Sequence, residues 1–137
     1  VVVTVLSHTD DGIPSNTILS TVETILNDDE VRPLTDHVTV QAATILPYQI
    51  EATLTLFEGP DASLVLLASE TAVTAYIANQ HRLGHDITLS GIFAALHQPG
   101  VQNVQITQPV ADIVVGPTEA AFCSAESLTL SVGGRDV

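Results

Sequence analysis

The side chains best suited to chemistry in this sequence are its histidines, its single cysteine and a few clustered carboxylates. His81 and His85 are four residues apart, a spacing that on one helix would place two imidazoles side by side for a metal such as zinc. Gly84 lies between them and favours a helix end. The sequence has no HExxH pattern and no cysteine nearby. We therefore expect exposed histidines at a helix end and no metal site.

Cys123 would be a candidate nucleophile if a histidine activated its thiol. Its neighbours Ala121, Phe122 and Ala125 are apolar, and no basic residue is close in the sequence. These surroundings indicate a small buried hydrophobic side chain. As the only cysteine of the chain, it cannot form an internal disulfide. We predict no catalytic residue and no enzymatic activity.

Two acidic clusters resemble parts of cation sites. Asp10, Asp11 and Gly12 match the start of a calcium loop, but the EF-hand spacing fails after Gly12. Residues 28–30 form a second cluster, which we interpret as a solvated turn with Arg32 as a partner. There is also no phosphate-binding glycine loop. The sequence predicts no metal, no cofactor and no small-molecule substrate.

Length and charge restrict the class of protein further. The 137 residues fit a single domain, and the net charge of −13, with three arginines and no lysine, repels nucleic acids and anionic membranes. No apolar run reaches the roughly 18 residues that a membrane span needs. The chain has no methionine and opens on valines. We expect a C-terminal fragment of a longer protein, with the missing part on its N-terminal side.

Residues 31–57 carry the clearest periodicity and should organise the fold. Apolar residues alternate with polar ones over residues 38–42 and again over residues 48–56, so each segment has one dry and one wet face. Two such strands a few residues apart predict an antiparallel hairpin. Residues 44–47 would form the turn or bulge between them, because Pro47 cannot donate a ladder hydrogen bond.

Two shorter helices are predicted on either side of this segment. The first begins at Ser15 or Asn16, and Asn27 ends it in a left-handed conformation. The second begins after Thr88 and stops at Pro99. Their inward apolar residues recur at helical spacing: Ile18, Leu19, Val22, Ile25 and Leu26 in the first, and Leu89, Ile92, Phe93 and Leu96 in the second.

The longest predicted helix covers residues 62–82, with Asp61 as its N-cap, and is apolar nearly all round. One face, which we expect to point inward, consists of Leu64, Leu67, Ala68, Thr71, Ala75 and Ala78. The remaining apolar residues include a candidate protein interface, formed by Val65, Leu66, Val73 and Tyr76. The alternative is a helix sandwiched between the sheet and the next helix.

Further strands are predicted near residues 1–6, 101–106, 113–115 and 128–132. Without its additions, the order of elements is β-α-β-β-α-β, the split βαβ or ferredoxin-like arrangement. We therefore predict an α+β domain with a mainly antiparallel sheet, helices on one face and extra C-terminal strands.

Three blocks together resemble the C-terminal part of J-type baseplate proteins of contractile-tailed, P2-like phages. They are LNDDEVRPLTDHVTVQAATILPYQIEATL (26–54), HRLGHDITLSGIFAALHQPGVQNVQI (81–106) and ADIVVGPTEAAFC (111–123). The most specific features are RPLTD before a strand, at residues 32–36, and QPGV after a short helix, at residues 98–101.

This resemblance implies a structural role in the tail baseplate, as a wedge component around the tail tube that rearranges on contraction. It implies contacts with the I-type wedge protein and with further copies of the chain. It also implies a location in the virion, after assembly in the host cytoplasm. No catalytic residues belong to this family, so the resemblance implies none in this chain. Phages, prophages, tailocins and other contractile injection systems all use such modules.

Two other classes of function stay open on the residues alone. A carbohydrate- or peptide-binding module would need exposed aromatic side chains, and the chain has only five aromatics, mostly at predicted core positions. A small enzyme would need His97 or Cys123 beside a carboxylate or another histidine.

Overall fold

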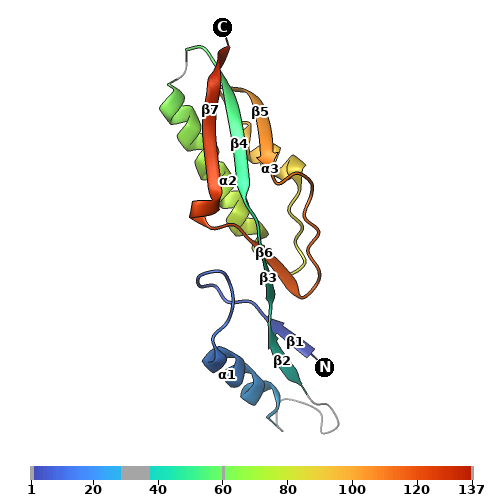
Figure 1. Cartoon of the computed structure of the whole chain (residues 1–137). Coiled ribbons are helices and arrows are strands. Elements are labelled where there is room, and N and C mark those ends of the chain that lie inside the picture. The colour runs from blue at the N-terminus through green and yellow to red at the C-terminus, as the bar shows by residue number, and fades with distance from the viewer. Residues whose placement is uncertain (1, 29–37, 60, 137) are drawn as a thin grey trace.

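The structure is a computed structural model that describes residues 2–28, 38–59 and 61–136. Two lobes follow one another along an elongated molecule (Figure 1). The smaller lobe contains described residues up to 43, and the larger lobe contains the rest. The predicted pairing of Arg32 with its acidic neighbours lies outside the described residues.

The smaller lobe is one β-α-β unit. Strand β1 (Val2–Val5) and strand β2 (Thr39–Ala42) pair in parallel, and helix α1 (Asn16–Leu26) connects them. Ser15, one of the two candidates, is the N-cap, and its hydroxyl accepts from the Ile18 N–H at 3.2 Å. No residue of α1 is fully buried, because only two strands lie under its apolar stripe.

Asn27 ends α1 in a different way from the one predicted. Its φ of −94° is not left-handed. Instead its side-chain amide donates to the Val38 carbonyl at 2.8 Å, and its oxygen accepts from the Val38 N–H at 3.0 Å. Asn27 therefore joins the helix end to the beginning of β2.

The predicted hairpin is wrong. Residues 39–57 form three nearly collinear strands, β2, β3 (Thr44–Pro47) and β4 (Ile50–Phe57), each in a different sheet (Figure 1). The expected turn is itself strand β3, which pairs in parallel with β6 (Glu119–Phe122). Tight hairpin turns need residues that tolerate positive φ, and residues 43–49 contain no glycine, asparagine or aspartate. The chain therefore stays extended.

Strand β4 is the centre of the larger lobe. It pairs antiparallel with β5 (Val101–Gln108) on one side and parallel with β7 (Leu128–Asp136) on the other. Its alternation is as predicted: Ile50, Ala52, Leu54 and Leu56 are all buried. Strand β7 continues to Asp136, beyond the predicted end near residue 132.

Helices α2 (Ala62–Gln80) and α3 (Leu89–Leu96) pack on the buried face of this sheet. Asp61 and Thr88 are their N-caps, as predicted. Ile92 and Leu96 of α3 are fully buried, but Phe93 is 39% exposed and does not point inward as expected. The core joins these side chains to those of β4 and to Val101 and Val104 of β5.

The α+β class and the placement of helices on one face are confirmed. The expected mainly antiparallel sheet is wrong, because β4–β5 is antiparallel but the other three strand pairs described, β1–β2, β3–β6 and β4–β7, are parallel. Agreement with a ferredoxin-like core is therefore loose. The strand predicted at 113–115 is a single bridge between Ile113 and Ile87, and a short 3-10 helix (Ala125–Ser127) leads from β6 to β7.

Candidate protein interface

The histidine pair does not form a metal site in the described structure. Helix α2 ends at Gln80, so His81 and His85 do not share a helix. Nδ1 of His81 lies 2.9 Å from the Ala121 carbonyl oxygen, and the ring stacks at a tilt on Phe122, with 5.3 Å between ring centroids. The described residues contain no cluster of three metal-ligating side chains. His81 packs between elements and is not the exposed histidine we expected.

Cys123 is buried, as predicted, and lies close to Tyr48 in the core. Burial raises the pKa of its thiol, and the Ile50 backbone only partly offsets this effect. Burial also raises the pKa of the Tyr48 phenol, with Cys123 and Tyr76 adding to the shift. Both groups are therefore neutral at physiological pH, which is unfavourable for nucleophilic chemistry.

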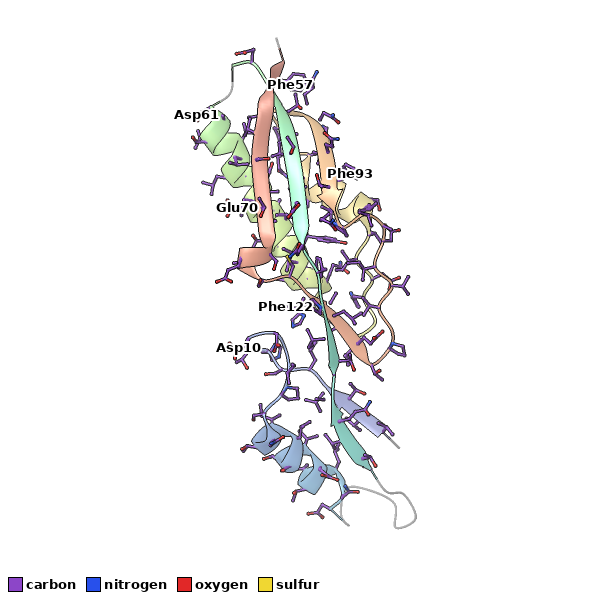
Figure 2. The ribbon with its side chains drawn as sticks, viewed as in Figure 1. Asp10, Phe57, Asp61, Glu70, Phe93 and Phe122 are labelled. Carbon is purple, nitrogen blue, oxygen red and sulfur yellow. The ribbon has the colours of Figure 1, made fainter. Side chains whose placement is uncertain are left out.

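The aromatic side chains do not form a stacking platform. Phe57 and Phe93 are exposed, but Figure 2 shows them well apart along the larger lobe. Tyr48 is buried, and the Tyr76 hydroxyl accepts from the Thr88 N–H at 3.1 Å. This arrangement offers no flat aromatic surface on which a sugar ring could stack.

The predicted orientation of α2 is wrong. Val65 and Val73 belong to the core, with exposed fractions of 6% and 0%, and Leu66 and Tyr76 pack against it. These four residues were the candidate interface. Because α2 is apolar nearly all round, helical spacing alone fits two opposite faces equally well. The actual inward face was missed because Ser69 interrupts it, and its hydroxyl donates to the Leu96 carbonyl at 2.9 Å.

The face that we expected inside is the exposed one. We call it the α2 outer face: Leu64, Leu67, Ala68, Thr71, Thr74, Ala75 and Ala78. The two leucines are 66% and 58% exposed. Glu70, beside this face, is the only charged residue of the helix. By length and composition alone α2 could span a membrane, but core helices of globular proteins have the same properties.

A cleft of about 740 Å³ lies between the two lobes at the C-terminal end of α2. Thr74 and Ala78 line it, so the cleft continues the α2 outer face. Its other walls are mostly apolar: Leu6 from the smaller lobe and Ile77, Leu83 and Phe122 from the larger. His8, His81 and Arg82 add its polar and cationic groups.

The two lobes meet through a small contact beside this cleft. Gly12, at a φ of +98°, lies against the buried Nε2 of His81, which has no hydrogen-bond partner among the described residues. Phe122 lines both this cleft and a second cavity of about 330 Å³ formed with Asp11 and Ile13. Figure 2 shows Phe122 at the junction, next to the loop that carries Asp10.

Comparison with known proteins identifies the larger lobe. Residues 48–129 match the family model described as "Baseplate J-like protein C-terminal domain". The chain belongs to the baseplate J-like family. Among curated relatives, it is 46% identical over 136 residues to Baseplate protein J of Escherichia phage P2, which covers 99% of this chain and 44% of that protein. The chain therefore spans less than half the length of this relative.

Proposed function

We propose that this chain is a structural component of a contractile-tail baseplate, where it forms wedge contacts around the tail tube. Its family and its similarity to the P2 protein support a structural role in the baseplate and a place in the virion tail. The same family favours a non-enzymatic role. The wedge contacts that we propose rest on the surface described above, and assembly in the host cytoplasm rests on the family alone.

The observation that carries the proposal is the exposed apolar surface of the larger lobe. The α2 outer face and the cleft at its end form one continuous surface without a cluster of catalytic groups. Contiguous exposed apolar surfaces are typical of protein–protein contact sites. We assign this surface to contacts with the I-type wedge protein or with further copies of the chain.

The junction between the lobes supports a role in rearrangement on contraction. One extended segment crosses from β2 to β3 at Ala43, whose N–H donates to the Val5 carbonyl at 2.9 Å. Beyond this crossing, the small contact around Gly12 and His81 lies between two cavities. A contact limited to a few residues permits hinge motion between rigid bodies.

The description of the family model also supports placing this lobe in the C-terminal part of a longer J-like protein. The predicted single domain covers residues 1–137; we propose that within it residues 48–129 can fold independently and that the smaller lobe connects them to the rest of such a protein. Limited proteolysis tests this assignment. Cleavage near residue 43 with survival of the larger lobe is expected, and unfolding of the larger lobe after cleavage would contradict it.

The role itself is tested by deleting the coding region of this chain from the tail gene cluster that carries it. We expect electron micrographs to show no assembled baseplates, with rescue by the intact gene. Normal contractile tails from the deletion strain would rule out the proposed function. Replacing only the larger lobe with that of another J-like protein would then show whether baseplate assembly requires the larger lobe of this chain.

A further inference from the structure

The α2 outer face is ordered by side-chain size. Its large residues, Leu64 and Leu67, lie at the N-terminal end of the helix, and its small residues, Ala75 and Ala78, lie at the C-terminal end. Thr71 is at the centre. At 100° per residue, all seven residues of the face lie within about 60° of the direction of Thr71. The face is therefore a straight apolar strip, large at one end and small at the other.

Such a strip is complementary to itself when it is turned end for end. A two-fold axis at the level of Thr71 places Leu64 against Ala78 of a second copy, and Leu67 beside its Ala75 and Thr74. Each leucine then meets a small residue, and interfaces with two-fold symmetry require this self-complementarity. We propose that the α2 outer face is the contact between two copies of this chain, with their α2 helices packed antiparallel.

The cleft between the lobes fits the same arrangement. Ala78, the residue that faces Leu64 of the second copy, lines the cleft together with Thr74. A leucine arriving there finds apolar walls from Leu6, Leu83 and Phe122. One symmetry operation therefore covers both the most exposed leucines of α2 and the cleft between the lobes.

Charge favours this face for a contact between copies. Each chain carries a net charge of −13, so two copies repel one another over most of their surfaces. The α2 outer face has no charged member, and Glu70 lies at its edge. Antiparallel helices also align their dipoles favourably. The contact should therefore be apolar and should strengthen as salt screens the net repulsion.

The size of the surface predicts a moderate affinity. A helix of 19 residues is about 28 Å long, so α2 alone gives less than the roughly 800 Å² per partner of a standard interface. The cleft must contribute the remainder. This inference deepens the proposed function, because it names the surface through which copies of the chain meet. Only the biological role of the contact, and not the contact itself, rests on the proposed function.

The test is the mass of the 137-residue chain by light scattering and sedimentation, from micromolar to millimolar concentration and at low and high salt. We expect the mass to rise from 14.4 kDa to twice that value, and at lower protein concentration when salt is high. Leu67→Asp should abolish the dimer. Val110→Asp is the matched control, because Val110 is an apolar residue 80% exposed on another loop.

Exchanging a pair of residues tests the antiparallel register. Leu67→Ala leaves a gap and Ala75→Leu places two leucines in opposition, so each should weaken dimerisation by about tenfold. The double variant restores one leucine against one alanine and should return to the affinity of the original chain. In a parallel pair each residue would face its own copy, so Ala75→Leu alone would add a second pair of leucines and would not show the loss expected for the antiparallel pair. Circular dichroism checks that all variants stay folded.

A chain that stays monomeric at millimolar concentration and high salt would overturn the inference. So would a dimer that Leu67→Asp leaves intact, or a double variant that stays weak. Failure of the inference is distinguishable from failure of the proposed function. If baseplates need the gene but tolerate Leu67→Asp, only the dimer contact is wrong. If the dimer forms but the gene is dispensable for tails, only the baseplate role is wrong.

Discussion

Gly12 and His81 approach so closely that a Cβ atom added at Gly12 would lie 2.7 Å from Nε2 of the His81 ring. The same atom would lie 2.5 Å from Cδ1 of Leu6. Gly12 is thus the point at which the smaller lobe meets the end of α2, and only a residue without a side chain fits there. The relation between the lobes depends on this residue.

Gly12→Ala should therefore destabilise the junction. The substitution combines a positive φ, which costs about 1 kcal/mol for a residue with a side chain, with a steric clash. Gly59→Ala is the matched control, because Gly59 has a φ of +107° and an added Cβ meets nothing within 4 Å. We expect a larger loss of stability in urea unfolding for Gly12→Ala, by about 1–2 kcal/mol. Equal losses for the two variants would contradict a tight contact at Gly12.

Asn27 should have an unusually large effect for a half-buried polar residue. Asn27→Ala removes the partners of both the Val38 N–H and the Val38 carbonyl, and Val38 is 9% exposed. We expect a loss of about 2 kcal/mol in urea unfolding, because both backbone groups are left unsatisfied. Asn79→Ala, at an exposed position of α2, is the control and should change stability by less than about 0.5 kcal/mol. A neutral Asn27→Ala would mean that water replaces these bonds.

Local signals in the sequence predicted most of the helices and strands correctly. They did not show which strands pair with one another. Ser15, Asp61 and Thr88 cap the predicted helices, because a capping hydroxyl or carboxylate acts within three residues. The alternation over β4 correctly identified its buried side chains. However, a strand with one dry face looks the same whether its neighbour is parallel or antiparallel. The alternation also does not show which strand is the neighbour, and the hairpin was predicted wrongly because β2 and β4 pair with other strands and not with each other.

The face of α2 that forms the candidate interface was also predicted wrongly, because local signals do not show which face of a helix packs against the rest of the fold. Helical spacing on α2 gave two possible inward faces, and the larger number of leucines and alanines favoured the wrong one. Ser69 was the missed signal, because a buried hydroxyl that bonds the Leu96 carbonyl belongs to the inward face. Residues that bond across elements far apart in the chain cannot be paired from a single sequence. The cleft between the lobes could not be predicted, because it depends on how the lobes meet.

Alkaline pH should destabilise the protein through Tyr48 and Cys123. Burial raises the pKa of both groups above their ordinary values of 10.0 and 9.0. Above those values the unfolded chain releases protons that the folded chain retains, so stability falls as pH rises. Thermal unfolding between about pH 7 and pH 11 measures this loss. Tyr48→Phe should flatten part of the decline.

At neutral pH, Tyr48→Phe and Tyr76→Phe should change the stability of the protein differently. The Tyr48 hydroxyl is buried without a hydrogen-bond partner among the described residues, so Tyr48→Phe should be neutral or slightly stabilising. The Tyr76 hydroxyl accepts from the Thr88 N–H, so Tyr76→Phe should cost about 1 kcal/mol. A clear loss from Tyr48→Phe would show that its hydroxyl has a partner, such as a bound water.

Because α2 has one buried and one exposed face, a new charge at Val73 and a new charge at Ala75 should have opposite effects on folding. Val73→Asp places a carboxylate at a position with no exposed surface, in the core cluster that also contains Ile92 and Leu54. An unpaired buried charge costs several kcal/mol, comparable to the whole stability of a small domain, so this variant should unfold. Ala75→Asp, on the α2 outer face, should keep the fold and lose only the contact between copies. Circular dichroism and light scattering on the two variants decide which face is inside, and a folded Val73→Asp would reverse the assignment.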